Sequence, residues 1–276
     1  MGLKPAGIAV PSLKVQDKTM ARRPYIVGNW KMHGTRAMLS EARAIDRAAQ
    51  RHMKVEVALA PPFTLIHPIH REAEQISVGA QDCHHQPDGA HTGDISATMV
   101  ADAGAKFVIL GHSERRTGHG ESDALVRAKA AAALAAGLRI IMCCGESGET
   151  RESGRAVAFI KKQLKASLPL PADAPVDLAE RITVAYEPLW AIGTGTPATT
   201  ADIAEMHGVI RQLLVELYGE EQGREVRIIY GGSVKPENAA EIFAVPEVGG
   251  ALVGGASLTA DSFMGIALAA GEPSDH

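Results

Sequence analysis

Charged side chains follow several short apolar runs of the sequence, at the points where those runs end. Lys31 comes shortly after the run 25–27, and Glu187 directly follows another apolar run. A single ammonium at Lys31 can neutralise a dianionic substrate or a developing oxyanion. A carboxylate at Glu187 that is partly withdrawn from water becomes a better base. The alternatives are a solvated surface lysine and an ion pair between Glu187 and a loop cation.

His112 stands between Gly111 and Ser113, where an apolar run gives way to a sequence typical of a helix start. The positive end of a helix disfavours an imidazolium ion. A neutral His112 ring that donates a hydrogen bond to a substrate oxygen is therefore plausible chemistry for this position.

Two later runs end in glycine pairs, Gly231-Gly232 before Ser233 and Gly254-Gly255 before Ala256. Exposed backbone N–H groups at such turns can hold an anion against a helix start. The alternative is that the glycines only permit tight turns. A base, a neutral electrophile, a lysine and a phosphate cradle together indicate proton abstraction next to a carbonyl on a small phosphorylated sugar. This chemistry needs no cofactor and no metal.

The histidines outside this set show no recognised metal-ligand spacing. His67 and His70 are spaced like neighbours on a helix, and His84 adjoins His85. We expect them to be surface histidines, so the sequence predicts no metal site.

The elements that would position these residues alternate along the chain. Eight apolar runs are candidate strands, at 25–27, 55–60, 76–80, 107–110, 138–143, 182–186, 226–230 and 251–253. Stretches of helical composition lie between them, at 36–51, 122–136, 151–167, 200–218 and 256–270. Apolar strands alternating with helices predict an α/β fold with a parallel sheet, either closed as a (β/α)8 barrel or open and doubly wound. Eight units without a midpoint break favour a single (β/α)8 TIM barrel.

We interpret the chain as one domain. Residues 1–23 carry no convincing period and are expected to form a flexible N-terminal extension, and 24–276 form the barrel. The longest irregular piece, 169–177, falls on the helix-to-strand side, away from the end of a barrel that carries function.

Composition excludes several classes of protein. Of 276 residues, 46% are hydrophobic and 22% charged, which excludes global disorder. The formal net charge of −4, without a basic block, argues against nucleic acid as a partner. The longest apolar run, 130–138, is too short to span a membrane. Cys143 and Cys144 would point to opposite faces of a strand, so the three cysteines favour a reducing, cytoplasmic location.

The sequence closely resembles the triosephosphate isomerase family over residues 24–270. Five motifs agree in order and spacing, namely GNWKM at 28–32, GHSERR at 111–116, YEPLWAIGTG at 186–195, YGGSV at 230–234 and VGGASL at 253–258.

The resemblance implies catalytic roles for four residues. Glu187 would move a proton between two carbons of a triose phosphate, and His112 would polarise the carbonyl and shuttle protons between the oxygens of an enediolate. Asn29 and Lys31 would line the site of the oxyanion and substrate.

The resemblance also implies supporting residues. The phosphate would meet the backbone of Gly193, Ser233, Gly254 and Gly255. Residues 188–195, with Ala191 and Ile192, would form a lid that Tyr230 and Ser233 hold shut. Glu114 would neighbour Lys31, and Cys143 would be a buried thiol near the base.

A homodimer follows from the same resemblance. The segment 84–96 resembles a protruding loop whose tip, at Thr92, enters a pocket beside the active site of a second copy. Asp82 and His91 depart from the family pattern in or next to this interface, where they bear on the strength or pH dependence of the dimer. His119 and Thr196 also depart from it, and Thr196 lies where lid kinetics would be affected.

Two other functions remain open from the sequence. An isomerase of four-carbon ketose phosphates could use the same scaffold, although the lid sequence 191–195 argues against it. A barrel that binds triose phosphate without catalysis is the second alternative, and it would have no use for Glu187, His112 and Lys31 together.

Overall fold

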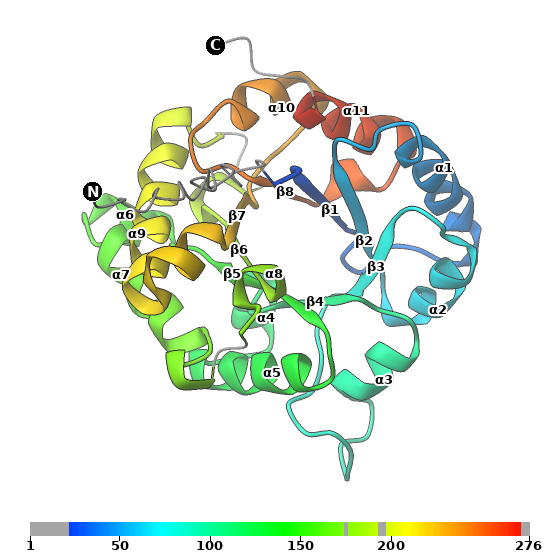
Figure 1. Cartoon of the computed structure of the whole chain (residues 1–276), viewed down its shortest axis with the longest axis horizontal. Helices are drawn as coiled ribbons and strands as arrows, with labels where there is room; N and C mark the ends of the chain where they lie inside the picture. Colours follow the sequence, from blue (N-terminus) through cyan, green and yellow to red (C-terminus); the bar gives the residue numbers. More distant parts are fainter. Residues whose placement is uncertain (1–21, 174–175, 193–196, 272–276) are drawn as a thin grey trace, which may run out of the picture.

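Eight parallel strands close into one barrel in a computed structural model that describes residues 22–173, 176–192 and 197–271. Each strand pairs with its neighbours in sequence, and β1 pairs with β8, so the barrel prediction is confirmed over the open sheet (Figure 1). The strands are β1 (Tyr25–Asn29), β2 (Glu56–Ala60), β3 (Ser77–Ala80), β4 (Phe107–Leu110), β5 (Arg139–Cys144), β6 (Ile182–Tyr186), β7 (Arg227–Tyr230) and β8 (Gly250–Val253). Each lies within two residues of its predicted bounds.

Burial on both faces of the strands explains their nearly continuous apolar sequences. One face fills the barrel interior, where Tyr25 and Phe107 meet edge to face with ring centroids 6.2 Å apart. The other face packs against the surrounding helices and forms the larger core. Because the strands are parallel, all of their carboxyl ends meet at one end of the barrel.

Helices surround the barrel and connect successive strands (Figure 1). They are α1 (Leu39–Ala49), α2 (Phe63–Glu72), α3 (Ala97–Asp102), α4 (Ser113–Gly118), α5 (Asp123–Ala135), α6 (Gly148–Glu152), α7 (Ala156–Ser167), α8 (Leu178–Arg181), α9 (Thr200–Glu225), α10 (Pro236–Phe243) and α11 (Ala260–Gly271). Short 3-10 turns are η1 (Arg36–Met38), η2 (Pro171–Asp173), η3 (Leu189–Ala191) and η4 (Gly255–Ser257).

Two predicted helices differ from the observed ones because of glycine. The stretch 151–167 is divided at Gly154, whose φ of 69° lies in the left-handed region. The stretch predicted to end at 218 continues to Glu225, with a kink at Gly219 (φ 80°). The helices α2, α3, α8 and α10 were not predicted, because most are short and α2 contains Pro68. Of α4 only the start, at His112, was expected.

The amino-terminal prediction concerns 1–23, of which only Arg22 and Arg23 are described. Arg22 donates hydrogen bonds to the carbonyls of Ala179 and Glu225, and Arg23 donates to the carbonyl of Met53 at 3.0 Å. No helix in the described ranges is long and apolar enough to cross a membrane.

The loop between β3 and α3 projects beyond the ring of helices (Figure 1). A bridge between His84 and Ser96 closes its base, and the Ser96 hydroxyl caps α3 by accepting from the backbone N–H of Met99. This loop coincides with the segment 84–96 of the sequence analysis, and its tip residue Thr92 is exposed.

One buried histidine makes the fold sensitive to acid. Burial lowers the pKa of His207 to about 4, although its Nδ1 contacts the backbone oxygen of Glu247 at 3.0 Å. As the pH falls, the His207 ring is protonated near pH 6.5 in the unfolded chain, before it is protonated in the folded protein. The neutral ring therefore contributes fully to the free energy of unfolding above about pH 6.5. This contribution, up to about 3 kcal/mol, is lost as the pH falls toward 4.

We therefore expect His207→Asn, which keeps a donor for the Glu247 carbonyl, to flatten the pH dependence of unfolding between pH 6.5 and 4. Denaturant titrations at a series of pH values measure this slope. The exposed His33→Asn is the matched control and should leave the slope unchanged. An equal slope in His207→Asn and wild type would contradict the assignment.

Candidate active site

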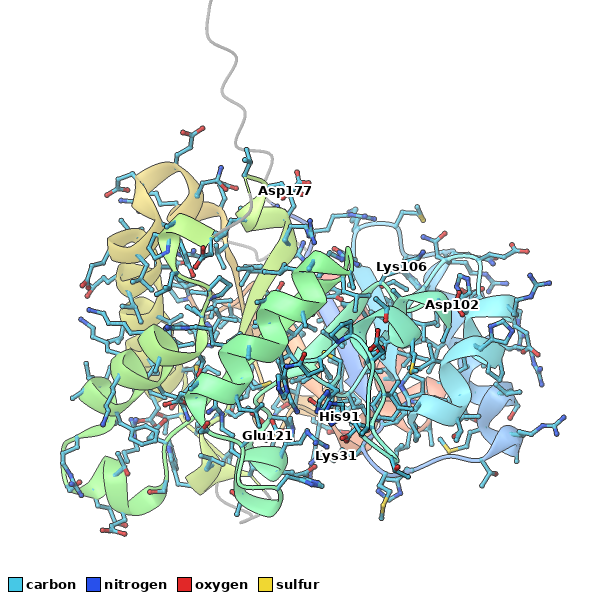
Figure 2. All side chains as sticks on the ribbon, turned by 90° about the horizontal axis from the view of Figure 1, so that it is seen from below. Lys31, His91, Asp102, Lys106, Glu121 and Asp177 are labelled. Carbon is cyan, nitrogen blue, oxygen red and sulfur yellow. The ribbon has the colours of Figure 1, made fainter. Side chains whose placement is uncertain are left out.

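A cavity of about 470 Å³ opens at the carboxyl ends of the strands, where the sequence places its polar residues. It lies at the end of the barrel that carries Lys31 in the side view (Figure 2). It brings together side chains from five strand ends. The lining residues are Asn29, Lys31, His112, Ser113, Glu114, Glu187, Leu189, Ile192, Gly231, Gly232, Ser233, Val234, Lys235, Leu252, Gly254, Gly255 and Ala256.

Glu187 follows β6 and is 2% exposed. Its backbone N–H continues the strand pairing by donating to the Cys144 carbonyl at 2.7 Å. Two glycines make room for it: a Cβ on Gly145 would lie 1.9 Å from the Glu187 carbonyl oxygen, and a Cβ on Gly231 would lie 2.9 Å from Cγ. Glu187 is thus closely packed and largely shielded from water.

The carboxylate of Glu187 contacts the start of α4. The Ser113 backbone N–H donates to Oε2 at 3.2 Å, the Ser113 hydroxyl donates to Oε1 at 3.2 Å, and His112 Nε2 lies 3.0 Å from Oε1. A carboxylate with both oxygens engaged must exchange these contacts before it takes a proton from a carbon atom.

His112 caps α4 with its own side chain. Nδ1 accepts a hydrogen bond from the Glu114 backbone N–H at 3.3 Å, so the proton of the neutral ring resides on Nε2, facing Glu187. Burial opposes charge on this ring, but the Glu187 carboxylate outweighs it and raises the pKa of His112 above its usual value. Loss of that carboxylate would favour the neutral ring.

Lys31 has a left-handed backbone (φ 52°), a strained conformation for a residue with a side chain. The Asn29 side-chain oxygen accepts from the Lys31 backbone N–H at 3.1 Å, and Gln81 Nε2 donates to the Lys31 carbonyl at 2.8 Å. These contacts fix the backbone, and Nζ is 2.6 Å from Glu114 Oε1. The expected proximity of Glu114 and Lys31 is therefore present.

The two glycine loops line the same cavity as Lys31. A Cβ on Gly254 would lie 3.9 Å from Lys31 Nζ. Asn238 fixes the other loop, because it accepts from the Lys235 backbone N–H at 2.8 Å and donates to the Ser233 carbonyl at 3.1 Å. Both predicted anion-binding turns thus line one cavity, and the Gly254 turn lies beside the Lys31 ammonium group.

Of the remaining predicted site residues, Ile192 lines the cavity. Ala191, Tyr230 and Cys143 are buried and do not line it. Burial raises the pKa of Tyr230 to about 12 and that of Cys143 well above its usual value, and Glu187 adds to the latter shift. Thr92 lies on the projecting loop and does not line the cavity of its own chain.

Three predictions fall wholly or partly outside the described residues. They concern the phosphate-binding role of Gly193, the departure at Thr196 and the part of the lid at 193–195. The other departures are described: Asp82 is buried, and Lys129 Nζ lies 2.8 Å from both of its oxygens. His119 ends α4 and is exposed.

Sequence reasoning missed Ser113, Gln81, Asn238 and Glu146. Fully buried Glu146 accepts from the Tyr186 hydroxyl and from Trp190 Nε1, both at 2.9 Å, and so ties β6 to the segment that follows it. The contacts of Ser113, Gln81 and Glu146 join residues far apart in sequence, so single-sequence periodicity carries no signal for them, whereas Asn238 contacts only its own loop. Ser113 was visible only as part of the motif at 111–116.

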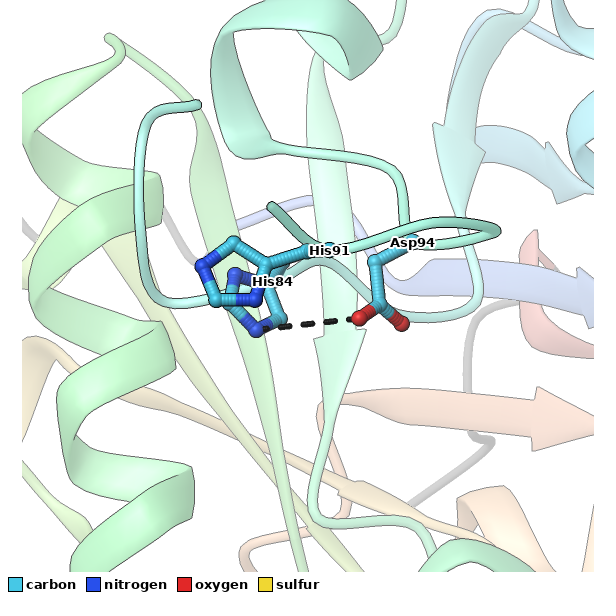
Figure 3. A group of neighbouring side chains, drawn as sticks. All are labelled: His84, His91 and Asp94. Atoms are coloured by element: carbon cyan, nitrogen blue, oxygen red, sulfur yellow. Dashed lines mark ion pairs between the residues drawn. The ribbon is translucent and has the colours of Figure 1, made fainter. Parts of the chain in front are cut away.

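One group of side chains within the described residues has metal-donor atoms close together: His84, His91 and Asp94 of the projecting loop (Figure 3). The His84 and His91 ring centroids are 4.1 Å apart. His84 Nδ1 accepts from the Gln86 backbone N–H at 3.1 Å, so the neutral ring carries its proton on Nε2, which faces Asp94 Oδ2 at 3.8 Å. A metal at Nε2 would require this arrangement to be broken, and the chemistry of the main site needs no metal.

The fold and cavity define a class of protein, a (β/α)8 barrel with an acid–base pair and an anion cradle at the carboxyl ends of its strands. The sequence profile described as triosephosphate isomerase matches residues 24–270. The chain belongs to the triosephosphate isomerase family, whose members are aldose–ketose isomerases.

Curated relatives and a solved structure agree with this family. The chain is 56% identical to a triosephosphate isomerase of Caulobacter vibrioides, over 88% of this chain and 95% of that protein. It is 51% identical to a triosephosphate isomerase of Xanthobacter flavus, over 92% of this chain and 100% of that protein. A crystal structure of triosephosphate isomerase from Bartonella henselae superposes with a TM-score of 0.82 at 44% identity, covering 90% of this chain and 99% of that chain.

The contact between His112 and Glu187 makes a testable prediction. Glu187→Gln removes the negative charge that raises the pKa of His112, and burial then acts with less opposition. We expect the His112 pKa to fall in this variant, so that less imidazolium is present at any given pH below neutrality. An NMR titration of the His112 ring protons, assigned by their loss in His112→Asn, measures it. Glu114→Gln, the matched control, should lower the pKa less, because Glu114 contributes less to the shift. An unchanged His112 pKa in Glu187→Gln would refute the coupling.

Proposed function

We propose that this site interconverts D-glyceraldehyde 3-phosphate and dihydroxyacetone phosphate, a step of glycolysis and gluconeogenesis, by proton transfer through an enediolate. The observation that carries the proposal is the 3.0 Å contact between the Glu187 carboxylate and His112 Nε2, beside Lys31 in one cavity. A base and a hydrogen-bond donor that share a cavity with an ammonium group suit a reaction in which negative charge develops on a carbonyl oxygen.

The base in this proposal is Glu187. Its oxygens leave Ser113 and His112, and one of them takes the proton from the carbon next to the carbonyl. The carboxylic acid so formed returns the proton to the neighbouring carbon. Gly231 leaves space beside Cγ of Glu187, where a side chain would collide with it.

His112 and Lys31 stabilise the enediolate. The proton on His112 Nε2 is donated to the developing oxyanion, and the capping bond at Nδ1 keeps the ring in this tautomer. Lys31 supplies positive charge, and Asn29 holds the Lys31 backbone through its side-chain oxygen. The backbone around Ser233, Gly254 and Gly255 holds the phosphate dianion.

Access of water to this cavity is restricted in the proposed closed state. The segment that begins at Ala191 and Ile192 covers the substrate, and Tyr230 and Ser233 stabilise that closure. Exclusion of water strengthens the electrostatic contacts and protects the enediolate from side reactions. The anchoring of Trp190 by Glu146 gives this segment a fixed base.

The active form in this proposal is a cytoplasmic homodimer. The projecting loop supports the dimer because its tip is exposed while its base is closely held. Below the base, Lys129 joins Asp82 and Glu121 in a buried ion cluster, with contacts of 2.8 and 2.6 Å. A preorganised loop loses less conformational entropy when it docks on a second copy.

Glu187→Gln tests the catalytic assignment, because the amide keeps the shape of the side chain and removes the base. We expect kcat to fall by about 10²- to 10⁴-fold, while affinity for a phosphate-bearing substrate is retained. A coupled assay of glyceraldehyde 3-phosphate isomerisation in metal-free buffer measures both. A near wild-type rate in this variant would show that Glu187 is not the base. If the folded wild-type protein converts only a tetrulose phosphate, the substrate is a four-carbon sugar phosphate instead.

Thr92→Arg tests the dimer, because it places a bulky charge at the exposed loop tip without disturbing the loop base. We expect sedimentation velocity to show a monomer with strongly reduced activity. Met53→Arg, a substitution at another exposed position on the opposite end of the barrel, is the control and should leave assembly unchanged. A Thr92→Arg protein that sediments as wild type would show that this loop does not form the interface.

A further inference from the structure

A second cavity, of about 290 Å³, lies at the amino ends of the strands. Its lining residues include the first or second residue of six strands, and Ala179 to Arg181 of α8. In the side view, Asp177 beside α8 lies at the end of the barrel opposite Lys31 (Figure 2). The lining residues are Arg22, Tyr25, Glu56, Phe107, Arg139, Ile140, Ile141, Ala179, Glu180, Arg181, Thr183 and Arg227.

The lining carries an excess of positive charge, with four arginines against two glutamates. Glu56 is shared by two of the arginines, with Arg139 Nη1 at 2.8 Å and Arg227 Nη2 at 3.2 Å. Arg22 donates to backbone carbonyls, and no described carboxylate pairs with it. One carboxylate therefore serves two guanidinium groups, and a third has none.

Arg181 is also only weakly compensated. Its Nη2 donates to the carbonyls of Leu134 and Leu138, and its nearest carboxylate contact is Asp177, 3.9 Å from Nη1. Asp177 does not line the cavity.

Two buried donors at this cavity, Nε of Arg227 and Nε of Arg181, lack a hydrogen-bond acceptor within the described residues. Tyr25 is 2% exposed, and the Arg227 guanidinium lies 4.9 Å from its ring centroid. Buried donors of this kind are rare in folded proteins and require an explanation. Burial lowers the pKa of Arg227, and the neighbouring Arg22 charge lowers it further, as expected for under-compensated positive charge.

We propose that this amino-end cavity binds a small phosphate-bearing dianion, at a site separate from the catalytic cavity. The planar donor fork of arginine suits phosphate oxygens, and several arginines around one cavity suit a doubly charged group. The volume is close to the lower end of the range for small-molecule sites. The shared chemistry is the phosphate dianion, whose source is either free phosphate or a phosphorylated metabolite.

NMR titration of the whole protein with inorganic phosphate, at constant ionic strength, measures phosphate binding at the two cavities separately. Backbone amides of Thr183 and Arg227 report on the amino-end cavity, and those of Gly232 and Gly254 report on the catalytic one. We expect two saturable isotherms. Sodium chloride at equal ionic strength should not reproduce the shifts of Thr183 and Arg227.

The double variant Arg22→Gln/Arg181→Gln should raise the phosphate Kd at the amino end at least tenfold and leave the isotherm of the catalytic cavity in place. The single variant Arg22→Gln, which breaks no ion pair, should raise the same Kd in the same direction and serves if the double variant is unstable. Arg51→Gln removes one exposed positive charge at the same end of the barrel without touching the cavity, and should match wild type.

Glycerol 3-phosphate distinguishes the two sources. Tighter binding of this ester than of phosphate at the amino end would identify a phosphorylated metabolite, and equal binding would identify free phosphate. Absence of a saturable amino-end isotherm, equal shifts with chloride, or an unchanged Kd in both variants would overturn the proposal. The amino-end amides report this result whatever the isomerase assay shows.

Discussion

The site depends on the contacts that hold the nearly inaccessible carboxylate of Glu187. A buried charge is costly unless hydrogen bonds compensate it. The compensation comes from the start of α4, through the Ser113 backbone, the Ser113 hydroxyl and His112 Nε2. These partners are 74 and 75 positions away in sequence, and they meet Glu187 only because β4, β5 and β6 are neighbours in a closed parallel barrel. Closure of the barrel, through the pairing of β1 with β8, adds Lys31 and the Gly254 turn to the same cavity.

The barrel itself could be predicted from the sequence because its signals are local. Each strand is a short apolar run, and each is buried on both faces, so the pattern survives without knowledge of the partners. Helices were harder, since Gly154 and Gly219 break or kink helical stretches whose composition continues through them. The start of α4 at His112 was expected, but a helix of six residues is too short for a helical period to show.

The site could be predicted only in part. Glu187, His112 and Lys31 stand out because they are polar residues after apolar runs, and the five motifs place them in a family. The positions of the supporting groups follow from three-dimensional contacts instead. Gln81 reaches the Lys31 carbonyl across 50 positions, and Glu146 joins Tyr186 and Trp190 across 40 and 44. The carboxylate of Glu187 points toward Ser113, and this direction also depends on contacts between distant parts of the sequence.

The two ends of the barrel treat charge in different ways, and the difference follows from strand direction. At the carboxyl ends, Lys31 is paired with Glu114, while both oxygens of Glu187 are engaged by α4, so each charge has a partner that a substrate can replace. At the amino ends, Arg139 and Arg227 share the single carboxylate of Glu56, and buried donors remain without acceptors. Substrate binding at the first end exchanges existing partners, whereas an anion at the second would add negative charge where arginines outnumber carboxylates. An anion that binds the folded protein there would also stabilise it, by mass action.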